Sequence, residues 1–282
     1  DLDGVDFFLS ADGNKNPEEE LRATLKAFQE PDRKFGKLSL PAACAFPARF
    51  TFLKKALNLE IARPACPKYE EYIAGFHSPV SATLVYSSAY PNNPASMFGH
   101  TFLRINSGDS TNGKKLDFLD MGLSFAASVS PDENPFVFAF LGLTGGYLGD
   151  FMMSPYHTKV YEYNNSESRD LWEYTLDLNP EETRRLIDNA WEIETNSFFN
   201  YYFFDENCSY QMLTLLEAAK PEWQISGFFL HTIPGESVKK LTDTPGAVVG
   251  VKFRASLYKQ MMKYADRLSL EESRVYDKIL AE

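Results

Sequence analysis

The chain has few of the residues that bind metals or polyanions. Its 282 residues include three cysteines and four histidines, with no Cys-x-x-Cys pair or close Cys/His cluster, so no metal site is expected. Asp and Glu (39) outnumber Lys and Arg (28), the formal charge is −11, and no basic block offsets it, which argues against nucleic acid. The uncharged stretch 135–149 is shorter than the ~20 apolar residues of a membrane-spanning helix and is broken by glycines.

The remaining composition is that of a globular chain. Hydrophobic residues make up 44%, enough for a sizeable core in one large domain or in one domain with helical extensions. No signal peptide precedes Asp1, so we expect either a cytosolic chain or one whose leader has been removed.

Cys208 is the most informative residue. It begins a helical stripe that stops before Pro221, with Asp205 or Asn207 as a candidate N-cap; the stripe is Cys208, Met212, Leu215, Leu216 and Ala219. A thiol in the first turn feels the positive end of the helix dipole and free N–H groups, which favour a thiolate and can hold an oxyanion. The alternative is a small buried hydrophobe, although the polar residues before Cys208 weigh against it.

A cysteine nucleophile needs a base, and His100 has the best setting for one. It opens a strand-like segment, and Gly99 beside it permits close approach by another backbone or a ligand. His77, His157 and His231 lack a comparable setting. The alternative for His100 is a hydrogen-bonded structural side chain.

The hydrophobic pattern predicts a mixture of helices and strands. Strands are expected at 82–86, 100–105 and 116–125, as a β-meander that carries His100, and at 159–163 and 171–176. Helices are expected at 16–28, after the N-cap Asn179 and in the tail 257–282.

Two apolar segments remain to be explained. The stretch 135–149, extended by Phe151, Met152 and Met153, is either a buried segment or a flexible loop that contacts lipid; its glycines favour the loop. Six of the seven residues at 198–204 are aromatic, and they fit the same acyl-chain groove or a packed core.

Several segments resemble the periplasmic domain of Lnb-type bacterial lipoprotein N-acyltransferases: 96–105, 145–147, 161–164, 167–174 and 202–210. The resemblance extends from about Cys44 to about Ser256. It implies an α+β, circularly permuted papain-like fold related to NlpC/P60, with an antiparallel sheet, packed helices and the base before the nucleophile. It also implies transfer of an acyl chain, through a cysteine thioester, to the N-terminal amine of a diacylated lipoprotein.

These implications define a set of candidate site residues. Cys208 is the nucleophile and His100 the base; Asp120 or Ser124 would orient the imidazole, as a polar residue on the next strand does in such sites, and Asn207 would contribute an amide to the oxyanion site. Substrate contacts are expected from the apolar segments, at Phe136, Phe138, Phe140, Leu141, Tyr147, Tyr202 and Phe204. No cofactor is implied.

The other two cysteines bear on the compartment. Cys44 and Cys66 lie in Pro-rich segments, where they form either a disulfide or two free buried thiols. One disulfide and one reactive cysteine suit a periplasmic enzyme associated peripherally with a membrane, whose partners are lipoproteins and phospholipid.

The predicted organisation is a helical extension at 1–75, a catalytic domain at 76–256 and a helical tail at 257–282. The alternative functions are an NlpC/P60-like cysteine peptidase of cell-wall peptides and a non-catalytic periplasmic binding module.

Overall fold

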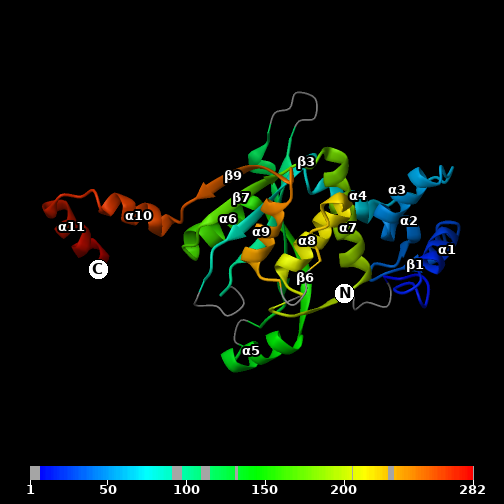
Figure 1. Cartoon of the computed structure of the whole chain (residues 1–282), viewed down its shortest axis with the longest axis horizontal. Helices are drawn as coiled ribbons and strands as arrows, with labels where there is room; N and C mark the ends of the chain where they lie inside the picture. Colours follow the sequence, from blue (N-terminus) through cyan, green and yellow to red (C-terminus); the bar gives the residue numbers. More distant parts are fainter. Residues whose placement is uncertain are drawn as a thin grey trace.

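A seven-stranded antiparallel sheet forms the centre of this computed structural model (Figure 1). The structure describes residues 7–90, 97–108, 115–130, 133–204, 206–227 and 232–281. Along the sheet the order is β8-β6-β5-β4-β3-β7-β9. The strands are β3 (Pro79–Ser87), β4 (His100–Ser107), β5 (Met121–Ala127), β6 (Tyr147–Pro155), β7 (Leu171–Leu176), β8 (Phe199–Tyr201) and β9 (Val248–Arg254). The predicted α+β class and the β3-β4-β5 meander are confirmed.

Alternation along the strands gives the sheet two buried faces. Leu84, Leu103 and Leu123 point to one face, which α7 (Pro180–Asn196) and α8 (Cys208–Ala219) cover. Val85 and Phe102 point to the other, where α6 (Tyr156–Val160) and the π-helical turn η3 (Tyr161–Ser166) supply Tyr156 and Tyr163. The sheet is therefore a central layer between helices.

The predicted N-cap Asn179 is confirmed, and Asn16 caps a second helix. Asn179 and Glu182 form a reciprocal capping box at the start of α7, with Pro180 in the first turn. Asn16 caps α1 (Pro17–Phe28) through the amide of Glu19. Both helices begin where a side chain satisfies an amide that the helix itself leaves free.

The N-terminal helices pack around a small core of their own, at one end of the molecule (Figure 1). They are α1, α2 (Ala42–Ala45) and α3 (Pro47–Ala56), with the short hairpin β1 (Lys34–Phe35) and β2 (Leu40–Pro41). Helix α4 (Pro67–Ala74) follows, and its Tyr69 packs with Cys44, Cys66 and Trp191. A disulfide joins Cys44 to Cys66. Arg49 bonds to Glu192, and the indole of Trp191 donates to the carbonyl of Cys44, so this unit is anchored on α7.

The C-terminal segment leaves the sheet at the edge formed by β9. After α9 (Pro234–Asp243) and the edge strand β9 come α10 (Leu257–Ala265) and α11 (Leu270–Ala281), which extend away from the body (Figure 1). No residue of α10 is buried. Short 3₁₀ turns lie at η2 (Asp117–Leu119) and η4 (Pro221–Trp223). No helix within the described ranges is long and apolar enough to cross a membrane.

Two sequence predictions about local structure were wrong. Residues 159–163 are not a strand: they belong to α6 and η3, where Tyr156, Lys159 and Tyr163 recur at helical spacing and are buried together. Within 116–125, a 3₁₀ turn precedes β5, which begins only at Met121.

The apolar stretch 135–149 is a helix followed by a strand, not a flexible loop. Helix α5 (Pro135–Thr144) is capped by Asn134 and ends at Gly145, whose φ of 73° suits glycine. Strand β6 then begins at Tyr147. The predicted domain limits fall after α4 and at Ser256, the N-cap of α10; the division into domains stays a prediction.

Candidate active site

Cys208 is the first residue of α8, as its helical stripe indicates. The side chain of Asn207 caps the helix by accepting hydrogen bonds from the amides of Ser209 (2.9 Å) and Tyr210 (3.3 Å). Asp205, the other candidate cap, lies outside the described residues. The Cys208 side chain is close to the positive end of the helix dipole but only 3% exposed, so its sulfur is shielded from solvent.

His100 is the first residue of β4, and the turn before it depends on glycine. Gly99 has a φ of 95°, and a Cβ there would lie 2.6 Å from the ring of Tyr86. The imidazole lies 6.1 Å from the ring of Phe102 and 5.7 Å from that of Tyr163, measured between centroids. These rings restrict how far the imidazole can turn.

Thr101, next to His100, joins β4 to the start of α8. Its hydroxyl oxygen lies 2.9 Å from the Ser209 hydroxyl oxygen and 4.0 Å from the Cys208 sulfur. All three residues are buried. This contact sets the distance between the strand that carries the histidine and the helix that carries the cysteine.

The electrostatics of the site favour a thiolate. Burial alone raises the pKa of Cys208, but the charge of His100 and its hydrogen bond to the sulfur, with hydrogen bonds from Thr101, lower that pKa to about 6. A free cysteine has a pKa near 8.5, so Cys208 is largely ionised at neutral pH, where an ordinary cysteine is not.

Tyr201 is a neighbour of Cys208 that the sequence did not single out. The amide of Cys208 donates to its hydroxyl oxygen at 3.4 Å. Burial, and then the charge of Cys208, raise the pKa of Tyr201 well above its ordinary value, so the phenol keeps its proton. The aromatic run 198–204 was the only sequence signal for this residue, and it gave no reason to separate Tyr201 from its neighbours.

Asn207 does not have the role expected of it. Its amide nitrogen donates to the carbonyls of Phe203 (3.0 Å) and Thr232 (2.6 Å), while its oxygen caps α8. Because both amide hydrogens are engaged, none is left for an oxyanion. The structure makes Asn207 a helix cap instead.

Asp120 and Ser124 also lie away from the imidazole. Asp120 accepts from Arg104 (2.6 Å) and from the amide of Ser107 (2.7 Å), near the other end of β4. The hydroxyl of Ser124 points to the carbonyl of Met152 at 3.5 Å. Strand β5 pairs with β4 only from Leu103 to Ile105, so neither residue is paired with His100, and a role for either in orienting the imidazole stays a prediction.

The residue opposite His100 is Ser87, on the strand at the other side. Ser87 and His100 are paired in the β3–β4 register, which puts their side chains on the same face of the sheet. Ser87 is fully buried, and its hydroxyl has no hydrogen-bond partner in the structure. A buried hydroxyl without a hydrogen-bond partner destabilises the fold. Its position opposite His100 therefore indicates a candidate partner for the imidazole.

The residues expected to contact an acyl chain form two groups. On α5, Phe136 is 87% and Phe140 65% exposed, whereas Phe138 is 9% exposed and packs on Tyr147 and Phe203. Leu141 is half-buried. Helix α5 projects from the body of the molecule (Figure 1).

The aromatic run before Cys208 holds α5 in place. Tyr202 covers Gly145, Phe203 fills the space beside Gly142, and Phe204 is exposed against Phe98. The amide of Phe203 donates to the carbonyl of Gly142 (3.0 Å), and the carbonyl of Phe203 accepts from Asn207. One residue therefore connects α5 to the cap of the helix that carries Cys208.

Of the other histidines, the structure describes His77 and His157. His77 is exposed, and His157 stacks on Phe118 at the surface. His231 lies outside the described residues. Across the described ranges, no group of three His, Cys, Asp or Glu side chains could hold a metal ion.

A cysteine of low pKa at a helix start, beside a histidine at the start of an antiparallel strand, defines a candidate thiol-dependent enzyme. Residues 68–244 match the Lnb N-terminal periplasmic domain, and the chain belongs to that family. Membership points to bacterial lipoprotein processing by an enzyme in the periplasm. Residues 1–56 match a domain of unknown function (DUF7843). No curated protein and no solved structure matches the chain.

Proposed function

We propose that the chain is a lipoprotein N-acyltransferase in which Cys208 carries the acyl group and His100 moves the protons. The observation that carries this proposal is the placement of Cys208 at the start of α8 beside His100 and Thr101 of β4, which lower the pKa of the thiol although its burial would raise it. Family membership supports a lipoprotein as the substrate.

In the first half-reaction the Cys208 thiolate, whose proton His100 holds, attacks an ester carbonyl of a phospholipid. A C–S bond forms, the ester C–O bond breaks, and the departing alcohol takes the proton from His100. We assign stabilisation of the oxyanion to the hydroxyl of Tyr201, which keeps its proton and lies beside the amide of Cys208. The product on the protein is an acyl thioester at Cys208.

In the second half-reaction the α-amine of a lipoprotein attacks the thioester. The C–N bond forms, the C–S bond breaks, and His100 takes the proton that the amine loses and returns it to the sulfur. Water competes with the amine, so burial of Cys208 and the rings around His100 favour transfer over hydrolysis.

Ser87 is a positioning residue in this scheme. Its free hydroxyl lies across the strand pair from His100, where it can accept a hydrogen bond from the imidazole when the ring becomes charged. It takes the place that the sequence offered to Asp120 and Ser124.

The surface of α5 supports a lipid substrate over a cell-wall peptide. No charged residue occurs from Asn134 to Gly149, yet Phe136, Val137, Phe140 and Leu143 are exposed. A peptidase would need a polar cleft, whereas exposed aromatic side chains on a charge-free helix suit the boundary between head groups and acyl chains. We propose that α5 rests on the membrane and that Phe203 links it to Cys208.

An intact-mass measurement tests the assignment. After incubation with phospholipid vesicles, the wild-type chain should gain the mass of one acyl group, and neutral hydroxylamine should remove it as expected for a thioester. Cys208→Ala should show no adduct, and His100→Ala should form it at least about a hundredfold more slowly, the usual scale of general-base loss.

Both variants should keep the wild-type melting temperature, since neither side chain belongs to the main hydrophobic core. An adduct that persists in Cys208→Ala, or a wild-type chain that never becomes acylated, would reject the mechanism.

A further inference from the structure

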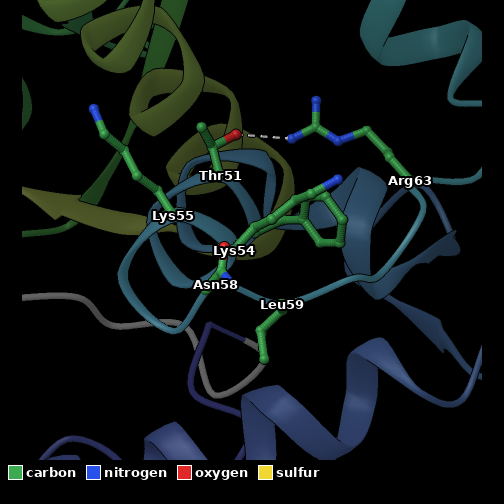
Figure 2. Close-up of a pocket in the computed structure, with 7 residues that line it drawn as sticks. Thr51, Lys54, Lys55, Asn58, Leu59 and Arg63 are labelled. Carbon is green, nitrogen blue, oxygen red and sulfur yellow. Dashed lines mark hydrogen bonds between the residues drawn. The ribbon is translucent and has the colours of Figure 1, made fainter.

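A pocket lies in the N-terminal helical unit, away from Cys208. It has a volume of about 570 Å³ and opens between α3 and the segment that leads from α3 toward Cys66 (Figure 2). Its lining is Phe50, Thr51, Lys54, Lys55, Asn58, Leu59 and Arg63. This volume is in the range of small-molecule sites, and the lining contains three cations but no carboxylate, in a chain of net charge −11.

Arg63 is fixed in the wall of this pocket. Its guanidinium donates to the carbonyl of Pro47 (3.1 Å) and to the hydroxyl of Thr51 (3.0 Å), the second bond being drawn in Figure 2. It lies 4.9 Å from the centre of the Phe50 ring, and its Nε is buried with no hydrogen-bond partner. No acidic side chain among the described residues pairs with it, so a preorganised cation is left without a counter-ion.

Lys54 approaches the same ring. Its ammonium lies 5.9 Å from the centre of Phe50, and in Figure 2 it extends toward Arg63. Among the placed side chains, no carboxylate forms an ion pair with Lys54, whereas Lys55 points away and pairs with Glu181 at 2.9 Å. Lys54 and Lys55 lie in the last turn of α3, where a positive charge stabilises the helix dipole. The dipole does not explain why Arg63, which is outside the helix, lies over the same Phe50 ring as Lys54.

We propose that this pocket binds a phosphate group carried on an apolar body. The phosphate takes the place between Lys54 and Arg63, where the ammonium and the Nη1 of the guanidinium remain as donors, and the apolar part rests on Phe50 and Leu59. The acidic surface of the chain repels long polyanions, so the ligand is a single small anion. The site is independent of the acyltransferase proposal.

Calorimetric titration at low salt with hexyl phosphate tests the site. Hexyl phosphate should bind roughly tenfold more tightly than inorganic phosphate, because part of its chain is buried on Phe50 and Leu59. Lys54→Gln and Arg63→Gln should each weaken it about tenfold, the scale for losing one charge-assisted hydrogen bond. Lys55→Gln, the matched control at an exposed pair, should change binding less than about twofold.

A soluble lipid separates the two sources of phosphate. Dihexanoyl phosphatidylglycerol that binds as tightly as hexyl phosphate identifies a lipid headgroup; much weaker binding identifies a phosphate monoester. Lys54 is exposed, so Lys54→Gln tests the site even if Arg63→Gln melts early. Absence of hexyl phosphate binding, or equal weakening by Lys54→Gln and Lys55→Gln, would overturn the proposal, whatever the outcome of the acylation experiment.

Discussion

At the scale of the residue, the chemistry of Cys208 depends on groups outside its own helix. The helix start contributes its dipole, but His100 and Thr101, both on β4, are what lower the pKa of the thiol against the effect of burial. With Cys44 and Cys66 joined, Cys208 is the free cysteine of the chain, so thiol chemistry reports on it alone.

The pH dependence of Cys208 alkylation should therefore reveal the effect of His100 on the pKa of the thiol. With iodoacetamide, the wild-type rate should rise with pH and be half-maximal near pH 6, because the thiolate forms above that pKa. In His100→Ala the midpoint should move above the ordinary cysteine range, because burial raises the pKa of the thiol and the histidine that lowers it is gone.

Ser87→Ala should move the same midpoint upward by a smaller amount, with an unchanged melting temperature. A purely structural Ser87 would alter stability and leave the pH profile where it was. An unchanged midpoint in His100→Ala would contradict the pairing of histidine and cysteine.

Residue identities and spacing predicted part of this site. The stripe from Cys208 to Ala219 is a property of one helix, so it could be read from the sequence. The partner of His100 could not, because the pairing of strands decides it: the register puts Ser87 opposite His100 and leaves Asp120 with Arg104. Tyr201 was missed for the same reason, since its contact with Cys208 joins two elements.

At the scale of the element, α5 divides the apolar stretch into an exposed and a buried side. The composition was visible in the sequence, but the helix was not expected, because its glycines suggested a loop. Gly142 and Gly145 instead admit the rings of Phe203 and Tyr202 against the helix. The strand expected at 159–163 failed likewise: burial at helical spacing overrode the local preference of aromatic residues for strands.

Substitutions on the two sides of α5 should have opposite effects. Phe136→Ala with Phe140→Ala should reduce binding to phospholipid vesicles and acylation from them, with little change in melting temperature. Phe138→Ala, the control on the buried side, should cost about 3–5 kcal/mol of unfolding free energy. Vesicle sedimentation and thermal melts measure both; a double variant that melts early but binds vesicles normally would contradict lipid contact.

At the scale of the whole molecule, the disulfide joins two parts of the N-terminal unit, and a hydrogen bond at one of its cysteines connects that unit to the body. Cys44 belongs to α2 and its carbonyl accepts from Trp191 of α7, while Cys66 precedes α4. Sequence spacing alone left free thiols open as an alternative, because connectivity is a property of the folded chain. The loop closed by this disulfide carries Arg63, which lines the N-terminal pocket.

Replacing both bridged cysteines with serine should lower the free energy of unfolding by about 3 kcal/mol, the value for a loop of this length. Acyl transfer at low temperature should persist, since Cys208 does not touch the bridge. Denaturant titration measures the loss, and non-reducing peptide mapping of exported protein checks the pairing. Equal stability of the two proteins, or free thiols at both positions, would count against the bridge.

The shielding of Cys208 has a consequence for the working life of the protein. Oxidants in an oxidising compartment react with thiolates faster than with thiols. Because its pKa is low, Cys208 is susceptible to oxidation to sulfenic acid and to mixed-disulfide formation. These reactions need access as well as charge, and the sulfur is enclosed by Thr101, Tyr201 and the start of α8. The packing that slows the approach of a substrate also keeps an ionised sulfur reduced between turnovers.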